Sequence, residues 1–214
     1  MTVPGSRKQY YERAFEISTE NEWNAAPGKD VFISALKQEV ASGRLSEYEA
    51  LIDIGCGTGY LLNRVQQEVC GSWRLAGVDF AQTAIERGKL LYPGITLLCE
   101  DGAATGLASE SFSVAISYGS MEHFPRPRDG VAEAGRVLRR GGLFLIMVPT
   151  LGAYRTDRHD EGWYEDFTGQ PQWNFTRNTW ESYFEQAGLS LWAPEAAQKN
   201  GALKPGNFYF GTKS

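Results

Sequence analysis

The chain is poor in cysteine and histidine and has no excess of positive charge, and these shortages exclude several classes of protein. Its three cysteines, Cys56, Cys70 and Cys99, are an odd number at unrelated spacings, which predicts reduced thiols and argues against a disulfide framework. There are 21 basic and 26 acidic side chains, and the formal net charge is −5. No run of basic residues is longer than a pair such as Arg139-Arg140, so the positive footprint that nucleic-acid partners require is missing.

Long apolar runs are missing as well. The longest, at 143–149, is far shorter than the roughly 18 residues of a membrane span, and residues 1–10 contain no apolar signal segment. We therefore expect a cytoplasmic protein that does not associate with membranes. The length of 214 residues and the apolar content of 42% are sufficient for one core, which predicts a single domain over residues 1–214.

Glycine is concentrated in the segment LIDIGCGTGYLL at 51–62. This segment predicts a buried strand, a tight turn and the start of a helix. Gly55, Gly57 and Gly59 remove the side chains that would keep a ligand away from the backbone. A helix that begins here directs free N–H groups toward the ligand, so the pattern indicates a nucleotide-binding turn.

The spacing of these glycines distinguishes between two nucleotide classes. A dinucleotide fingerprint that began at Gly55 would need glycine or alanine where the chain has Tyr60, so a nicotinamide oxidoreductase is disfavoured. Asp53 followed by the pattern G-x-G-x-G instead resembles the first motif of the class I methyltransferases, which use S-adenosylmethionine. The resemblance implies that Asp53, Gly55, Cys56 and Gly57 contact this cofactor.

Beyond the turn, short apolar strands alternate with helical segments, which is typical of a doubly wound parallel sheet with helices on both faces. Strands are predicted at 51–54, 74–79, 95–99, 112–117, 143–148, 189–193 and 207–212. Further helices are predicted at 82–91, from Pro127 until Gly141, and at 178–187. The sequence therefore predicts an α/β fold with a mostly parallel seven-stranded sheet, and the resemblance implies the Rossmann-like methyltransferase fold.

Two segments lie outside this alternation. Residues 1–45 predict two helices, which we expect to form an N-terminal cover on the cofactor side. Residues 150–175 interrupt the passage from the fifth strand to the next helix and are rich in aromatic side chains. A loop of this length without secondary structure is usually a functional lid or a disordered segment, and the aromatic content argues against disorder. We therefore expect a substrate lid at 150–175.

The resemblance extends over residues 48–148 and implies a cofactor contact at the end of strand two. The family places an acidic residue there that binds the two ribose hydroxyls, and Asp79-Phe80 stands at this position, twenty residues beyond Gly59. A carboxylate suits this task because it accepts two hydroxyl hydrogen bonds at once.

Two further cofactor contacts are implied after strands three and four. The family places an acidic residue beside the adenine amino group, which Asp101-Gly102 matches at the end of strand three, with Glu100 as the alternative. Ser117 ends strand four, which passes beneath the methionine part of the cofactor.

The family also has a structural signature before strand five, which Glu133 and Arg136 resemble. The chain departs from the family at two positions. Ser113 replaces the usual aspartate in strand four, and Arg140 replaces the usual proline before the double glycine. Neither departure touches the expected cofactor contacts.

Methyl transfer from a sulfonium is an in-line displacement, so the protein mainly holds the nucleophile about 3 to 3.5 Å from the methyl carbon and excludes water. A phenol, an alcohol or a carbon acid also needs a base. His123, at the predicted end of strand four, is either that base or part of the framework, since the family often keeps a histidine there. Tyr118 and Glu122 are weaker candidates near it. His159 is either a base carried by the lid or a solvated surface residue.

The composition of the insertion indicates what the acceptor is like. Five acidic side chains stand there against two arginines, together with two tryptophans and two tyrosines. Acidic and aromatic groups suit a cationic or planar partner, because an ammonium over an aromatic face gains about 0.5 to 2 kcal/mol. Tyr154, Trp163 and Trp173 are the candidate contacts. In the alternative, the aromatic residues cover one end of the sheet and the acids face solvent.

The sequence therefore predicts an S-adenosylmethionine-dependent methyltransferase that acts on a small molecule through an amine, a phenol or other hydroxyl, or a carboxylate. No metal site is predicted. The alternative is a non-catalytic protein that binds S-adenosylmethionine or S-adenosylhomocysteine as a regulatory ligand, because a fold does not guarantee a reaction.

Overall fold

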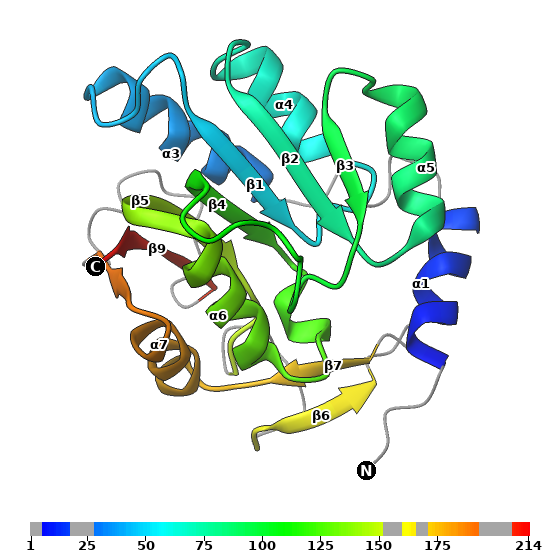
Figure 1. The fold of residues 1–214 in the computed structure, drawn as a ribbon. Coiled ribbons are helices and arrows are strands. Elements are labelled where there is room, and N and C mark those ends of the chain that lie inside the picture. Colours follow the sequence, from blue (N-terminus) through cyan, green and yellow to red (C-terminus); the bar gives the residue numbers. More distant parts are fainter. Residues whose placement is uncertain (1–5, 18–27, 152–159, 166–170, 193–206) are drawn as a thin grey trace.

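The computed structural model describes residues 6–17, 28–151, 160–165, 171–192 and 207–214. A seven-stranded sheet with the order β3-β2-β1-β4-β5-β9-β8 forms its centre (Figure 1). Its strands are β1 (Ala50–Ile54), β2 (Arg74–Asp79), β3 (Thr96–Cys99), β4 (Phe112–Tyr118), β5 (Leu138–Met147), β8 (Leu189–Leu191) and β9 (Phe208–Lys213). The α-helices of these ranges are α1 (Ser6–Ile17), α3 (Lys29–Ala41), α4 (Tyr60–Glu68), α5 (Gln82–Leu91), α6 (Pro127–Val137) and α7 (Arg177–Gln186).

Strands β1 to β5 run parallel, and β9 lies antiparallel between β5 and β8. The predicted α/β fold with a mostly parallel seven-stranded sheet is therefore confirmed. The chain order reverses between β1 and β4, where Asp53 is paired with Ile116. In open sheets of this kind, ligands bind outside the carboxyl ends of the strands at this point of reversal.

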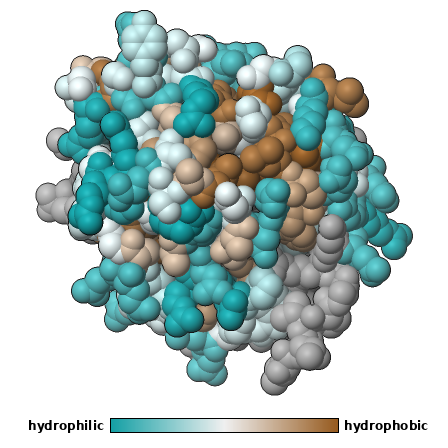
Figure 2. All heavy atoms as spheres, in the orientation of Figure 1, coloured by the Kyte–Doolittle hydropathy of each residue, from teal (hydrophilic) through white to brown (hydrophobic). Residues whose placement is uncertain are grey.

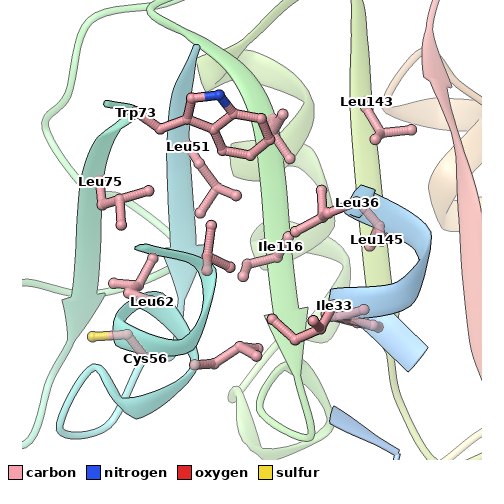
Figure 3. Packing of buried hydrophobic residues seen from close by; sticks show 14 of the residues in the cluster. Ile33, Leu36, Leu51, Cys56, Leu62, Trp73, Leu75, Ile116, Leu143 and Leu145 are labelled. Atoms are coloured by element: carbon pink, nitrogen blue, oxygen red, sulfur yellow. The ribbon is translucent and has the colours of Figure 1, made fainter. Parts of the chain in front are cut away.

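Two apolar layers cover the two faces of the sheet, because side chains alternate between faces along each strand. Figure 1 shows α4 behind the sheet and α6 in front of it. The rear layer joins α3, α4 and α5 to the strands, and Figure 3 shows some of its members: Ile33, Leu36, Leu51, Leu62, Ile116 and Leu145. The front layer joins α6 and α7 to the opposite face. The strands are thus buried on both sides, which explains their continuous apolar sequence.

The connection from β3 to β4, at 100–111, contains no helix. Figure 2 shows an apolar patch over β2 and β3 on this face of the molecule, and Leu98, Ala103 and Leu107 pack against the front layer as partly buried residues. Glu133 of α6 anchors this loop, because its Oε1 accepts hydrogen bonds from the backbone N–H and the hydroxyl of Thr105, at 2.9 and 2.6 Å.

Arg136 completes this anchor. Its guanidinium binds both oxygens of Glu133, each at 2.7 Å. The bonds from Arg136, and after them those from Thr105, lower the pKa of Glu133 to about 2 although burial opposes the shift. The predicted structural signature before β5 thus fixes the loop beside the end of β3.

The prediction that Gly141 ends the helix after Pro127 is wrong. Helix α6 ends at Val137, and β5 begins at Leu138. Gly141 has a φ of +70° and lies inside β5, where the pairing with β4 shifts between Phe112 and Val114. A left-handed glycine occurs both after helices and in strand bulges, so the sequence pattern alone did not distinguish the two.

The expectation that the insertion lacks its own secondary structure is also wrong for its described part. β6 (Gly162–Glu165) and β7 (Pro171–Asn174) form a two-stranded antiparallel sheet. Trp163 and Trp173 lie opposite each other, with ring centroids 5.4 Å apart. Such cross-strand aromatic pairs stabilise short hairpins. Strands of four residues are too short to give a clear period, which is why the pattern was missed.

Ser113, one of the two departures from the family pattern, has a local role. Its hydroxyl accepts from the N–H of Ala50 at 3.0 Å and donates to the carbonyl of Ala50 at 3.1 Å, which joins the starts of β4 and β1. The three cysteines are free thiols. None of the helices in the described ranges has both the length and the apolar character needed to cross a bilayer.

Candidate functional site

The turn after β1 is held by hydrogen bonds from its backbone N–H groups to β2. Gly55, Gly57 and Gly59 have φ values of +79°, +55° and +83°. Residues other than glycine rarely adopt this left-handed region. The N–H groups of Gly55 and Cys56 donate to the carbonyl of Val78, at 2.8 and 3.0 Å. A Cβ on Gly57 would stand 3.3 Å from the ring of Phe15, and one on Gly55 would overlap Ser120. The backbone of this turn therefore has to stay bare.

Asp79, the predicted ribose ligand, also organises the turn. Its Oδ2 accepts from the N–H of Gly57, and its Oδ1 accepts from the N–H of Ala81, both at 2.9 Å. Each carboxylate oxygen has a second lone pair, so these bonds leave capacity for a ligand. The carboxylate connects the glycine turn to the start of α5.

Three predicted cofactor contacts have buried side chains or none. Burial raises the pKa of the Cys56 thiol well above its usual range. The Ser117 hydroxyl donates to the carbonyl of Ile54 at 2.7 Å. Gly102 lies so close to Phe124 that a Cβ would come within 2.6 Å of that ring. These residues offer only their backbone to a ligand.

Two more predicted contacts, Phe80 and Asp101, follow the ends of β2 and β3. Asp101 is exposed, and its Oδ1 accepts from the N–H of Ala103 at 2.9 Å. Phe80 faces Tyr11 of α1, with ring centroids 5.4 Å apart in an edge-to-face arrangement. An aromatic surface therefore lies beside the acidic end of β3.

Helix α1 is attached over this region. The two oxygens of Glu12 accept from the N–H groups of Gln82 and Thr83, each at 2.9 Å, and so cap the start of α5. Tyr11 is buried and lies 5.7 Å from the ring of His123. Sequence reasoning missed the roles of Tyr11, Glu12 and Phe15, because α1 has no clear apolar period and its partners are far along the chain.

The short 3-10 helix η1 (Met121–His123) follows β4 and carries Glu122 and His123. Glu122 is buried, its Oε2 has no hydrogen-bond partner among the described residues, and burial raises its pKa to about 8. Its Oε1 lies 3.7 Å from Nε2 of His123. That distance exceeds a hydrogen bond but allows the charge of one group to influence the other.

The hairpin β6–β7 contacts the η1 region through β7. The indole N–H of Trp173 donates to the carbonyl of Phe124 at 3.1 Å, and its ring stacks on Phe175 at 5.3 Å. Glu161, counted as one of the acids that would attract a cation, instead accepts from the N–H of Thr176 at 2.6 Å and helps to begin α7. Tyr154 and His159 lie outside the described residues.

Asp53 lies two residues before the glycine turn and is buried within the rear layer. The positive charge of Lys29, the first residue of α3, acts on the Asp53 carboxylate and lowers its pKa against the larger effect of burial. Sequence reasoning missed Lys29 because nothing in the local pattern distinguishes it. The ammonium of Lys29 lies over the rings of Tyr60 and Tyr118, at 5.4 and 5.6 Å. Tyr118, which was a weaker candidate for contact with the methyl acceptor, thus packs against Lys29.

Comparison with known proteins agrees with this arrangement. Residues 52–146 match a family described as a methyltransferase domain. A probable S-adenosylmethionine-dependent methyltransferase of Mycolicibacterium smegmatis is 24% identical over 149 residues, which are 69% of this chain and 49% of that protein. A chloroplastic 2-methyl-6-phytyl-1,4-hydroquinone methyltransferase 2 of Oryza sativa subsp. japonica is 30% identical over 105 residues, which are 46% of this chain and 29% of that protein. The chain thus spans half or less of the length of these relatives.

Among solved structures, the 1,6-didemethyltoxoflavin-N1-methyltransferase of Burkholderia thailandensis has a similar fold. That structure contains 1,6-didemethyltoxoflavin and S-adenosylhomocysteine. The TM-score is 0.65 at 15% identity, and the alignment covers 99% of this chain and 89% of the other. A likeness at this identity supports the fold and leaves the acceptor open.

Proposed function

Because the chain belongs to the class I S-adenosylmethionine-dependent methyltransferases, with S-adenosylmethionine as its cofactor, we propose that it methylates a small-molecule acceptor at an amine, a phenol or other hydroxyl, or a carboxylate. The observation that carries this proposal is the bare glycine turn fixed by the carboxylate of Asp79. This turn lies at the carboxyl end of β1, beside the point where the strand order reverses.

The residues at this edge fit the parts of the cofactor. A Cβ at Gly55 would overlap Ser120 and one at Gly57 would crowd Phe15, so the backbone of the turn keeps this shape only with glycine at these positions. Asp79 would hold the ribose hydroxyls, and Asp101 would lie beside the adenine amino group. The backbone at Ser117 would face the methionine part.

The cofactor supplies a methyl group on a sulfonium when bound, and the chain contributes positioning and the exclusion of water. Tyr11 of α1 and Trp173 of β7 both approach η1, which follows the end of β4. Removal of water from such a site strengthens every charge interaction within it.

His123 is the base in this proposal when the acceptor is a hydroxyl. Its Nε2 would take the proton, and Glu122 at 3.7 Å would then release its own proton more readily, because a neighbouring positive charge favours the carboxylate. An amine acceptor in its neutral form needs no such step.

A flat or cationic acceptor suits the aromatic surroundings of η1. Tyr11 and Trp173 present rings near this helix, and Trp163 extends the aromatic surface along the hairpin. The hydroquinone in the name of the Oryza sativa relative and the 1,6-didemethyltoxoflavin in the structure with a similar fold both contain planar rings, which supports the same class for this chain.

Incubation of the purified protein with methyl-labelled S-adenosylmethionine and pooled amines, phenols and carboxylates tests the proposal. We expect label in one pool and a tenfold or greater loss of label transfer in Trp163→Ala. Binding of S-adenosylhomocysteine without label in any pool would contradict catalysis and favour the regulatory alternative. Label in a phenol pool that is lost in His123→Gln but retained in Tyr10→Phe would support the base.

A further inference from the structure

The two faces of the hairpin β6–β7 differ in character. Trp173 and Phe175 stack on each other and pack into the front layer. Successive side chains of a strand point to opposite sides, so Asn174, which stands between these two residues, points away from that layer. Its partner across the hairpin is Gly162, where a Cβ would meet no described atom within 4 Å. The hairpin therefore leaves room beside Asn174.

Asn174 carries a buried donor that the protein does not use. Its side chain is only 4% exposed, and Nδ2 has no hydrogen-bond partner in the part of the chain that the structure describes. Such an amide costs free energy, because folding removes the water that binds it in the unfolded chain. Unpaired buried donors are rare in folded proteins, and an acceptor atom of a ligand is one way to pair them. An apolar residue here would avoid the cost, so stability alone does not explain the asparagine.

The position of Asn174 is fixed by contacts to the segment that leaves β5. The N–H of Leu151 donates to the carbonyl of Phe175 at 2.8 Å, and Thr150 forms an isolated bridge with the same residue. β7 also lies against η1, and Figure 1 shows the hairpin below the arrowheads of β1 and β2. Asn174 thus lies at the edge of the sheet where ligands of such folds bind.

Glu122 approaches the same end of β5 from η1. Its Oε1 lies 3.7 Å from the place that a Cβ of Gly119 would take. The N–H of Gly119 donates to the carbonyl of Met147, the last residue of β5, at 2.9 Å. Oε2 of Glu122 is buried without a partner among the described residues. Two elements that contact each other, η1 and β7, thus each bring an unpaired polar atom close to the end of β5.

We propose that Asn174 is a specificity-determining residue of the acceptor site, where its Nδ2 donates a hydrogen bond to a carbonyl oxygen or a ring nitrogen of the methyl acceptor. This inference rests on the proposed function, because it names the substrate class of the same site. A hydrogen bond of this kind contributes about tenfold to the preference for an acceptor. A compound without such an atom leaves the amide unpaired, and the site therefore disfavours it.

Asn174→Leu and a split set of acceptors test the proposal. The pools of amines, phenols and carboxylates are each divided into compounds with and without a further carbonyl oxygen or ring nitrogen. The unmodified protein should label the compounds that have this atom. Asn174→Leu should lower label transfer to them by about tenfold or more, while the affinity for S-adenosylhomocysteine stays the same. Asn178→Leu, at an exposed position of α7, is the matched control.

The melting temperature gives a second readout that does not depend on the acceptor. Because Asn174→Leu removes an unpaired buried amide, we expect it to melt about 2 °C or more above the unmodified protein. Asn174→Asp keeps the shape of the side chain and replaces the donor by an oxygen. The same selective loss of label transfer in this variant would show that the donor matters and not the packing.

Three results would overturn the proposal. The first is a preference of the unmodified protein for compounds that lack the carbonyl oxygen or ring nitrogen. The second is an equal loss of label transfer for both kinds of compound in Asn174→Leu and Asn174→Asp. The third is a lower melting temperature of Asn174→Leu with normal label transfer, which would mean that the amide only supports the hairpin. No label in any pool with the unmodified protein would instead contradict the proposed function itself.

Discussion

The glycine turn and the η1 helix lie at the ends of neighbouring strands, yet they are built in opposite ways. In the turn, the polar groups are satisfied by the protein, and Asp79 holds two backbone N–H groups with its two oxygens. In η1, Glu122 is buried with an oxygen that lacks a partner among the described residues. The backbone of the turn is fixed in shape, whereas a buried carboxyl oxygen without a hydrogen bond is unfavourable and would be stabilised by a donor.

This difference suggests separate tasks for the turn and for η1. Under the proposed function, the fixed backbone of the turn would bind the cofactor, a ligand that is always the same. Side chains from α1, η1 and the hairpin would contact the acceptor, the ligand that differs between methyltransferases. Changes in the turn should therefore affect cofactor affinity, and changes around η1 should affect turnover or pH dependence.

Gly57→Val should have the largest effect. A branched side chain at a φ of +55° is strained, and its Cβ would approach the ring of Phe15. We expect affinity for S-adenosylhomocysteine, measured by titration calorimetry, to fall by at least about 100-fold. Gly43→Val is the matched control, because Gly43 has a φ of +78° with no atom within 4 Å of a Cβ. Similar affinity in both variants would show that the turn tolerates a side chain.

Asp79→Ala should weaken cofactor binding less severely. Loss of a charge-assisted acceptor costs about 1.5 to 3 kcal/mol, which corresponds to a roughly ten- to hundredfold loss of affinity. Because the same carboxylate holds Gly57 and Ala81, we also expect a lower melting temperature. Asp101→Ala, at an exposed site, should have the weaker effect of the two. An unchanged dissociation constant in Asp79→Ala would mean that the ribose contact is assigned to the wrong residue.

Trp163→Ala tests the acceptor side. We expect turnover to fall or the Michaelis constant of the acceptor to rise about tenfold, the size expected for an aromatic anchor worth about 1.5 kcal/mol, while cofactor affinity stays the same. Trp192→Ala is the control, because Trp192 lies under Arg44 away from the hairpin. Normal kinetics together with a lower melting temperature would mean that the hairpin only covers the sheet.

Glu122→Gln should have the smallest effect on ligand binding, and its effect should appear instead in the pH dependence of stability. In the folded protein this carboxyl keeps its proton up to about pH 8, whereas in the unfolded chain it loses the proton near its ordinary pKa of 4.5. The contribution of Glu122 to stability is thus complete below pH 4.5 and is lost as the pH rises toward 8.

Urea unfolding at several pH values measures this loss. The unfolding free energy of the unmodified protein should decrease over that range by about 1 to 3 kcal/mol more than that of Glu122→Gln. The control is Glu185→Gln, at an exposed position of α7. Equal slopes for the protein and Glu122→Gln would show that this carboxyl ionises as it does in water.

The sequence was most informative where structure is local. The helix at 82–91 and the strand at 74–79 have the bounds that were predicted, because Pro93-Gly94 stops the helix and the apolar run of the strand is continuous. The glycine turn was equally readable, since its chemistry depends on five consecutive residues. Gly141 was misassigned because a left-handed glycine suits two different structures.

The acceptor side was less predictable for a physical reason. Tyr11 and His123 meet although more than a hundred residues separate them, and Lys29 reaches Asp53 only after α3 has packed on the sheet. Contacts of this kind leave no period or spacing in the sequence. The hairpin β6–β7 was missed because each strand has four residues, and its acids were counted as a group although Glu161 is bound to α7.

The position of β9 has a consequence for synthesis of the chain. β9 inserts between β5 and β8, and Leu143 to Met147 pair with Thr212 to Phe208. Until this segment has left the ribosome, β5 remains an open edge whose apolar side chains and unpaired backbone groups favour association with other chains. β8 has no partner in the sheet other than β9 among the described strands. The nascent protein therefore carries this open edge while the residues between β5 and β9 are translated, and β5 and β8 are joined only when β9 is added.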